Sequence, residues 1–190
     1  MTSNSSNKIG HVAIIMDGNS RWARQRNLKT IEGHKQGVNR LRDIVKYSAK
    51  SEITHLSVFA FSTENWKRSA SDVSDLMKLF LQSIIKEVPE LIENKVQLNF
   101  IGDIPRFSKS LVSQINSAMK DTQAKKPNLN LNVAISYGGR WDILNAIKRI
   151  KDHKINTDKL SEDEFSNLLS TSDFPCLLYT SDAADDGLCV

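Results

Sequence analysis

The chain has 190 residues, which is enough for one domain with a sizeable buried core and too few for two comfortable ones. Hydrophobic residues make up 39% and charged residues 25%, a composition that predicts a soluble globular protein. Apolar runs of the roughly 18 residues that a membrane span needs are missing, and the polar first eight residues lack the build of a signal peptide. Collagen, coiled coils, disulfide scaffolds and integral membrane proteins are therefore excluded.

The net charge of +4 is unevenly distributed. Residues 1–175 carry 26 basic and 19 acidic side chains, a net charge of +7, whereas residues 176–190 contain three aspartates, both cysteines and no Lys or Arg. The basic excess indicates an anionic ligand, such as phosphate, nucleic acid or a lipid surface. A body without cysteine fits a reducing compartment and excludes a thiol nucleophile or a zinc site there.

Four short apolar runs predict buried strands. They cover residues 11–16, 55–61, 96–101 and 129–136, and each is followed by polar or glycine-containing residues. Apolar residues at three- and four-residue spacing predict intervening helices within residues 38–49, 73–88, 111–119 and 141–150. Pro89 is expected to end the second helix, Ser108 to cap the third, and Ser161 to form a capping box with Glu164. This alternation predicts a parallel α/β sheet covered by helices on both faces.

Ligands of open α/β folds bind beyond the carboxyl ends of the strands, so these segments are the candidate site. Residues 17–22, 62–68 and 137–142 hold all three tryptophans, together with glycine, arginine and amide side chains. In the first segment, Gly18 permits a tight turn, Arg21 offers a forked donor for phosphate, and Asp17 offers a ligand for Mg²⁺. The alternative is an ordinary turn in which Asp17 caps a helix and Arg21 is solvated.

Three further features each allow a structural and a functional interpretation. Gly33-His34-x-x-Gly37 opens the next helix, where an imidazole and free N–H groups could meet phosphate, although a single histidine is more often structural. We expect Arg140, after two glycines, to brace the sheet through a salt bridge. The wide apolar stripe of residues 73–88 is typical of a core helix, and it is also compatible with the wall of a tunnel for an alkyl ligand.

Five motifs in order resemble the cis-prenyltransferase family, of the undecaprenyl diphosphate synthase type. They are His11-Val-Ala-Ile-Ile-Met-Asp-Gly-Asn-Ser-Arg-Trp-Ala23, Gly33-His-x-x-Gly37, Phe59-Ala-Phe-Ser-Thr-Glu-Asn-Trp66, Ile101-Gly-Asp103 with Arg106-Phe107, and Tyr137-Gly-Gly-Arg-Trp-Asp-Ile143. The resemblance implies an α/β fold with a central parallel sheet. It also implies a cytoplasmic homodimeric enzyme that condenses isopentenyl diphosphate onto farnesyl diphosphate with Mg²⁺, with peripheral membrane contact for product release and no nucleic acid.

The resemblance also implies roles for individual residues. Asp17 corresponds to the aspartate that engages Mg²⁺ and assists the departure of diphosphate. Asn65 corresponds to a residue described as a proton acceptor, although a neutral amide is a poor base and we expect it to position the proton's path. The expected substrate-binding residues are Gly18, Asn19, Ser20, Arg21, Trp22, His34, Ser62, Thr63, Glu64, Trp66 and Arg68.

The sequence departs from the family pattern at several positions. Ser20, Thr30 and Ser69 stand where glycine, arginine and proline are usual. The family's later motif for isopentenyl diphosphate and the second Mg²⁺ carboxylate is not found after Pro175. We therefore expect a polar N-terminal tail at 1–10, an incomplete family domain at 11–175, and a non-native tail at 176–190. Its acids, Asp182, Asp185 and Asp186, are given no function.

Such a chain is expected to lack turnover, to expose an unpaired sheet edge and apolar dimer surface, and to have low stability. Two alternatives stay open at this point. One is a non-catalytic partner subunit of a prenyltransferase complex, which is disfavoured because Asp17, Arg21 and Asn65 are retained. The other is a basic nucleic-acid-binding α/β protein, although the basic residues form no single stripe.

Overall fold

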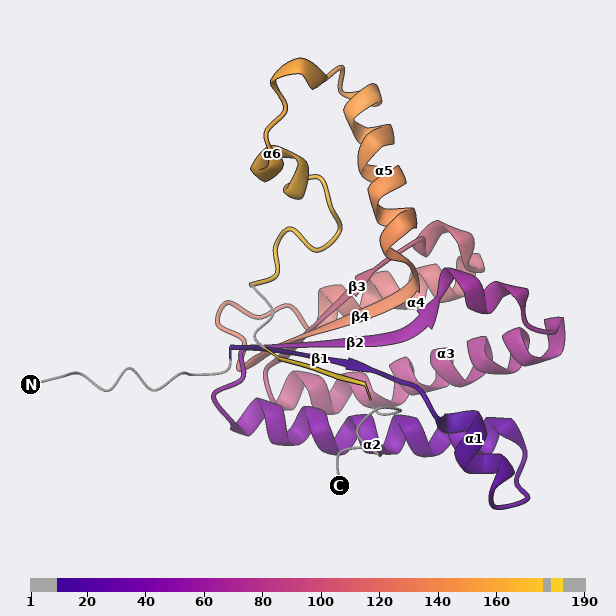
Figure 1. Ribbon diagram of the computed structural model, residues 1–190. Coiled ribbons are helices and arrows are strands. Elements are labelled where there is room, and N and C mark those ends of the chain that lie inside the picture. Colours follow the sequence, from indigo (N-terminus) through magenta and orange to yellow (C-terminus); the bar gives the residue numbers. More distant parts are fainter. Residues whose placement is uncertain (1–9, 176–178, 183–190) are drawn as a thin grey trace, which may run out of the picture.

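A five-stranded parallel sheet forms the centre of the molecule (Figure 1). The computed structural model describes residues 10–175 and 179–182. The strands run in the order β3-β4-β2-β1-β5, and each neighbouring pair is parallel. Their bounds are β1 His11–Ile15, β2 His55–Ser62, β3 Val96–Ile101, β4 Leu129–Tyr137 and β5 Tyr179–Asp182. The four predicted strands are confirmed.

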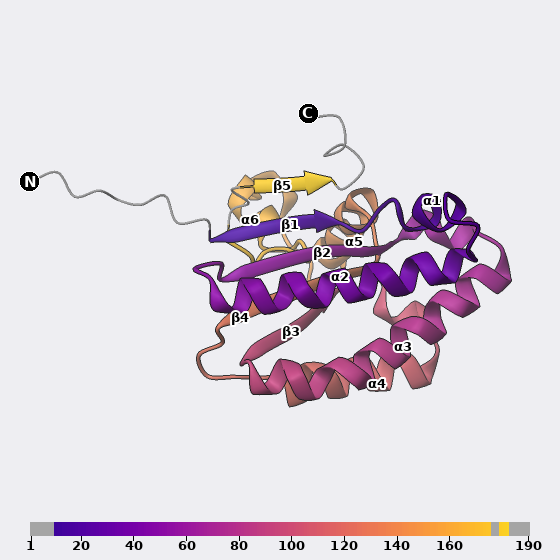
Figure 2. The ribbon, with the colours of Figure 1, turned by 90° about the horizontal axis from the view of Figure 1, so that it is seen from below.

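The helices lie on both faces of the sheet, as predicted. Helices α2 and α3 cover one face, with α4 beside α3, while α5 and α6 stand on the other (Figures 1 and 2). The helices are α1 Asn19–Arg24, α2 Thr30–Lys50, α3 Ala70–Glu93, α4 Lys109–Asp121, α5 Gly139–Asp152 and α6 Glu162–Ser166. Single 3₁₀ turns η1 Thr63–Lys67, η2 Ile104–Arg106 and η3 Thr157–Lys159 complete the described elements.

Two predicted helix boundaries are wrong, and both predicted caps at serine are confirmed. Helix α2 begins at Thr30, upstream of Gly33. Helix α3 passes through the exposed Pro89 and continues to Glu93, because Leu91 beyond the proline is buried in the core and holds the last turn in place. Ser108 caps α4 by accepting a hydrogen bond from the Leu111 N–H, and Ser161 forms its capping box with Glu164.

The core fills the space between the sheet and the helices α2, α3 and α4. Its largest fully buried side chains include Leu56 and Val58 of β2, Leu129 and Ile135 of β4, and Ile115 of α4. These positions alternate along β2, as expected for a strand whose one face meets the helices. The described residues include no helix that is long and apolar enough to cross a membrane.

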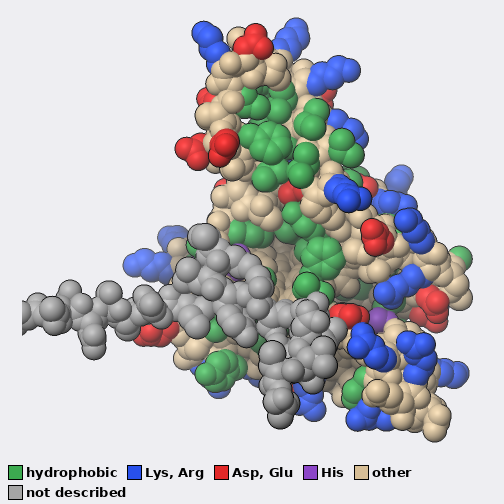
Figure 3. All heavy atoms as spheres, viewed as in Figure 1, with side chains coloured by type: hydrophobic (Ala, Val, Ile, Leu, Met, Phe, Trp, Pro, Cys, Tyr) green, Lys and Arg blue, Asp and Glu red, His purple; other side chains and the backbone are tan. Residues whose placement is uncertain are grey.

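Helix α5 presents apolar side chains outward rather than into this core. Ile143, Leu144 and Ile147 are each about half exposed, while Ala146 and Ile150 are buried. Hydrophobic side chains gather around α5 on the face shown in Figure 3. The stripe predicted within residues 141–150 is therefore only partly core, since no other described element covers its outer side.

The segment after α5 is held to the sheet by buried polar contacts. Asp142 is 2% exposed and accepts hydrogen bonds from the Tyr137 hydroxyl and from the Ser170 N–H and hydroxyl. Burial, followed by the charge and hydrogen bond of Asp142, raises the pKa of Tyr137 to about 12, so the phenol remains a donor. The imidazole Nδ1 of His11 lies 2.8 Å from the Pro175 carbonyl oxygen.

The strand β5 lies in the segment that we expected to be a non-native tail. It pairs in parallel with β1, with Val12 opposite Tyr179 and Ile15 opposite Asp182. The outer edge of β1 is therefore paired. Of the tail acids, Asp182 ends this strand, while Asp185 and Asp186 lie outside the described residues.

Candidate functional site

The polar segments predicted as the site follow the carboxyl ends of β1, β2 and β4. In the first segment, Gly18 adopts φ 83°, a left-handed conformation that glycine permits, and α1 begins directly after it. The predicted tight turn is thus confirmed. Ser20 lies inside α1 and is not among the described non-glycine residues with positive φ, so its replacement of glycine causes no backbone strain there.

The glycines of the Gly33-His34-x-x-Gly37 motif let α1 approach α2 closely. A Cβ atom built on Gly33 would lie 2.0 Å from the Asn19 carbonyl oxygen, and one on Gly37 would lie 2.6 Å from Asn19 Oδ1. Both distances are far below ordinary contact. A side chain at Gly33 would meet backbone, which cannot move aside, whereas one at Gly37 would meet the movable tip of the Asn19 side chain. Since α2 begins at Thr30, the expectation that this motif opens the helix and offers free N–H groups to phosphate is wrong. Instead, the two glycines allow Asn19 of α1 to lie directly against α2.

His34 lies between these glycines in the sequence of α2, and its side chain is partly buried. Its Nε2 atom is buried and has no hydrogen-bond partner among the described residues. Burial, and secondarily the charge of Arg68, lower the pKa of His34, while Asp72 opposes this shift. A buried ring nitrogen without a partner is rare in folded proteins and indicates a place where a polar ligand atom would fit.

After β2, the residues of the second segment form the turn η1. The Ser62 hydroxyl accepts from the Asn65 N–H, while Asn65 Oδ1 accepts from the Ser62 N–H at 3.0 Å. Because Asn65 Oδ1 is used in this capping box, the Nδ2 amide of Asn65 is the part of its side chain that can donate to a ligand. Ser69, which stands where the family usually has proline, caps α3 by accepting from the Asp72 N–H.

Four other predicted substrate-binding residues do not line the cavity that Asn19, His34, Asn65 and Arg68 share, namely Trp22, Thr63, Glu64 and Trp66. The Trp66 indole donates to the Ser136 hydroxyl at 2.9 Å and packs among aromatic rings, with Arg106 over its face. Trp22 stacks under Arg26, Thr63 lies against Gly138, and Glu64 is exposed. Arg140 is exposed and forms no ion pair with any residue that the structure describes, so its expected salt bridge is not found within residues 10–175.

Asp17 lies between β1 and α1, and Arg21 lies within α1. Their side chains are 55% and 58% exposed and form an ion pair at 3.6 Å. Within residues 10–175 and 179–182, no group of three or more potential ligands that could hold a metal ion occurs. One accessible carboxylate nevertheless fits Mg²⁺, which keeps several waters and is often held by one or two carboxylates plus phosphates of the substrate.

A cavity of about 210 Å³ extends from this polar end between the sheet, α2 and α3. Asn19, His34, Asn65 and Arg68 line it at the polar end, so the structure brings these four predicted residues together. The rest of the lining is mostly apolar and includes Val38, Val45, Leu76, Phe80, Ile84, Leu91, Leu98, Phe100 and Leu131. The stripe predicted within residues 73–88 therefore serves both as core and as cavity wall.

The sequence did not single out the charged residues that also line this cavity. These are Arg42 and Lys46 of α2 and Glu87 and Glu90 of α3. The available signal was the spacing of the two basic residues at i and i+4 and of the two acidic residues at i and i+3. This spacing places each pair on one face of its helix. Such pairs are common on solvated helix faces, so the signal alone indicates no site.

Comparison with known proteins identifies the family. Residues 15–183 match the model of a protein family described as "Putative undecaprenyl diphosphate synthase". The chain belongs to this prenyltransferase family. It is 43% identical over 169 residues to a ditrans,polycis-undecaprenyl-diphosphate synthase, (2E,6E)-farnesyl-diphosphate specific, of Coxiella burnetii, covering 87% of this chain and 71% of that protein. It is 43% identical over 165 residues to an isoprenyl transferase of Neisseria meningitidis, covering 87% and 65%.

Solved structures agree with this assignment. Lavandulyl diphosphate synthase from Lavandula x intermedia, in complex with dimethylallyl diphosphate, superimposes with a TM-score of 0.82 at 31% identity. The match covers 87% of this chain and 72% of that one. A probable undecaprenyl diphosphate synthase from Campylobacter jejuni gives a TM-score of 0.70 at 29% identity, covering 86% and 70%. The predicted family and its α/β fold are thus confirmed, and the chain spans about two thirds of the length of the curated relatives.

Proposed function

We propose that this chain is an isoprenyl transferase whose cavity binds an allylic diphosphate, such as farnesyl diphosphate, and that it is of the type that extends this substrate with isopentenyl diphosphate into a long polyprenyl diphosphate. One observation carries the proposal: the apolar cavity has predicted diphosphate-binding residues only at one end. An allylic diphosphate has the same division into a charged head and an apolar chain. The relatives are named as enzymes of this type, which favours catalysis over the two alternatives.

The diphosphate would occupy the polar end. Arg68 offers a forked donor, the Asn65 Nδ2 amide offers a neutral donor, and His34 Nε2 supplies a buried polar atom that needs a partner. Their shared position in the lining of one cavity supports a single site for the head group. The apolar wall then excludes water from the chain, and burial of that apolar surface supplies most of the affinity for it.

Asp17 would hold Mg²⁺ against the diphosphate. The metal, when bound, would neutralise charge that grows on the leaving diphosphate. Arg21, which pairs with Asp17 at 3.6 Å, is placed to stabilise the same charge with its guanidinium group. Asn65 uses its carbonyl oxygen within the capping box, so it is poorly suited to accept a proton and better suited to hold an oxygen of the diphosphate.

The remaining expectations from the resemblance belong to this proposal as well. They are the homodimer, the cytoplasmic location with peripheral membrane contact, and roles for Gly18, Asn19, Ser20 and Trp22 around the diphosphate. The exposed side chains of α5, Ile143, Leu144 and Ile147, support a homodimer because a subunit interface would cover them. The boundary of the domain at 175 and the absence of turnover stay predictions.

The test measures binding of farnesyl diphosphate and of farnesol, with Mg²⁺ and with EDTA, by displacement of N-phenyl-1-naphthylamine. We expect the diphosphate to bind at least tenfold more tightly than the alcohol with Mg²⁺, a difference worth about 1.4 kcal/mol. Arg68→Gln and Asp17→Asn should each reduce that difference, and EDTA should have no further effect on Asp17→Asn.

Arg24→Gln is the matched control, because Arg24 is an exposed arginine of α1 outside the cavity lining. It should leave the preference for the diphosphate unchanged. Equal binding of diphosphate and alcohol by the unaltered chain would refute the proposed recognition. Synthesis of polyprenyl diphosphate, followed with labelled isopentenyl diphosphate, decides separately whether the 190-residue chain turns over.

A further inference from the structure

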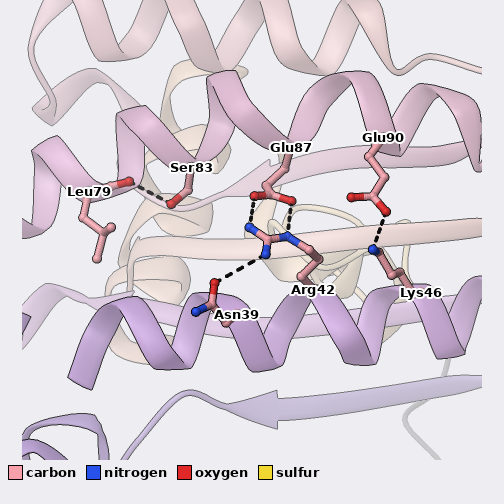
Figure 4. Close-up of polar contacts among 7 residues, drawn as sticks. All are labelled: Asn39, Arg42, Lys46, Leu79, Ser83, Glu87 and Glu90. Carbon is pink, nitrogen blue, oxygen red and sulfur yellow. Dashed lines mark hydrogen bonds and ion pairs between the residues drawn. The ribbon is translucent and has the colours of Figure 1, made fainter. Parts of the chain in front are cut away.

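Two ion pairs join α2 to α3 along the solvent side of the cavity (Figure 4). The Arg42 guanidinium donates from Nε to Glu87 Oε2 at 2.7 Å and from Nη2 to Glu87 Oε1. Its Nη1 donates to Asn39 Oδ1 at 3.4 Å. Lys46 Nζ lies 2.7 Å from Glu90 Oε1. We call Arg42, Lys46, Glu87 and Glu90 the ionic wall.

The ionic wall is part of the cavity and is also its boundary with water. All four side chains line the cavity. The side chains of Arg42 and Glu87 are 25% and 19% exposed, and those of Lys46 and Glu90 are 45% and 37% exposed. Charged groups stay at the rim because full burial would remove their hydration. Their alkyl stems can cover the apolar interior while the charges face water.

The wall is well suited to hold the two helices at one separation. Bidentate pairing of a guanidinium with a carboxylate fixes direction as well as distance. The hydrogen bond to Arg42 holds the pKa of Glu87 below its usual range, so this pair remains charged near neutral pH. The pairs lie about 12 Å and about 18 Å from His34 along α2, at about 1.5 Å of rise per residue. A chain that extends from the polar end therefore runs past them.

The cavity is small for a long chain. An engineered protein cavity of about 150 Å³ holds one benzene molecule, and this one has about 210 Å³. The opposite wall is the sheet, whose lining side chains include Leu98, Leu131 and Val133. These side chains are close-packed, so the sheet cannot move far to enlarge the cavity. Room for further isoprene units is most easily gained where polar contacts, which water can replace, join α2 to α3.

We infer that the ionic wall is a specificity-determining element that limits how long a prenyl chain the cavity accepts. Separation of Arg42 from Glu87 and of Lys46 from Glu90 opens the cavity sideways and admits longer chains. The inference rests on the proposed function for the identity of the chain, and it concerns chain length rather than recognition of the diphosphate.

The experiment compares twenty-carbon with fifteen-carbon ligands, because the ionic wall is proposed to limit the length of the bound chain. Geranylgeranyl and farnesyl diphosphates, and the corresponding alcohols, compete with N-phenyl-1-naphthylamine for the full chain. The variant Glu87→Gln with Glu90→Gln keeps side-chain volume and removes both ion pairs. We expect it to shift the ratio of affinities toward the twenty-carbon ligand by about fivefold, the scale of partly exposed ion pairs. Binding of the fifteen-carbon ligand should change less than twofold.

Two further variants control the result. Arg40→Gln breaks the exposed pair of Arg40 with Asp43 on α2, which does not line the cavity, and should leave the ratio unchanged. Arg42→Glu with Glu87→Arg reverses the pair and should restore a ratio near that of the unaltered chain, which Arg42→Glu alone should not. Circular dichroism confirms folding of each variant.

An unchanged ratio in the double glutamine variant would overturn the inference. The alcohols make this outcome independent of the proposed function. If the diphosphates bind no better than the alcohols, recognition of diphosphate fails, while the ratio for the two alcohols still decides whether the wall limits chain length.

Discussion

Replacement of Gly33 by alanine tests how the site is built, because this glycine allows α1 to touch α2. The added Cβ would lie 2.0 Å from the Asn19 carbonyl oxygen, whereas ordinary contact begins near 3.4 Å. The backbone of Asn19 would therefore have to move by about 1.4 Å. Backbone cannot rotate away as the tip of a side chain can, so the expected cost is at the upper end for overpacking, about 3 kcal/mol.

A gain in helix propensity offsets part of this cost. Alanine in place of glycine inside a helix stabilises it by about 1 kcal/mol, which leaves a net destabilisation of about 2 kcal/mol for Gly33→Ala. For a chain of this size, that lowers Tm by about 4–8 °C. Because Asn19 lines the polar end of the cavity, the affinity for farnesyl diphosphate should fall as well.

Alanine substitutions at two other glycines give stabilities with which that of Gly33→Ala is compared. Gly37→Ala meets only the Asn19 side-chain tip, at 2.6 Å, so a smaller loss of stability is expected. Gly139→Ala at the start of α5 meets nothing within 4 Å and should be neutral or stabilising, by up to about 1 kcal/mol. Thermal denaturation followed by circular dichroism gives the order. If Gly33→Ala melts at or above the unaltered chain, the close contact between α1 and α2 is not what requires glycine.

Two further predictions concern buried polar groups. Burial lowers the pKa of His34, so the unfolded chain binds a proton below pH 6.5 that the folded chain resists, and stability should fall as pH drops below that value. His34→Gln should flatten this slope in urea titrations from pH 7 to pH 5, and an identical slope would contradict the assignment. Asp142→Ala leaves the donors of Tyr137 and Ser170 without their acceptor and should cost about 2–4 kcal/mol in urea unfolding. The exposed Asp152→Ala should cost less than about 0.5 kcal/mol, and equal losses would argue against the buried network.

The sequence was most informative where a residue type has few structural uses. A glycine directly after an apolar strand, as at Gly18, predicts a tight turn on its own. The structure confirms the turn, with Gly18 at φ 83°. Serine followed by glutamate three residues later predicted the capping box at Ser161. Such signals are local, because the groups that satisfy each other lie within a few residues.

Features that depend on distant segments were harder to predict. The glycines Gly33 and Gly37 suggested a phosphate cradle, although their neighbour is Asn19, which the fold brings to them from another helix. Arg140 suggested a brace, whereas among the described residues Asp142 acts as one, by accepting hydrogen bonds from Ser170. The strand β5 pairs with β1 across most of the chain length, and composition alone gave no indication of it.

The cavity itself shows the limit of periodicity. Apolar residues at helical spacing produce the same pattern whether they pack against a sheet or face an empty space, so Leu76, Phe80 and Ile84 could not reveal which they do. Energetics separates the two cases. At about 24 cal/mol per Å³, an unfilled closed cavity of 210 Å³ would cost about 5 kcal/mol, which approaches the whole stability of many domains. Opening toward water lowers this cost but leaves apolar surface wetted. A cavity of this size is therefore maintained against packing, and its mostly apolar lining supports the proposal that it takes the apolar chain of a ligand.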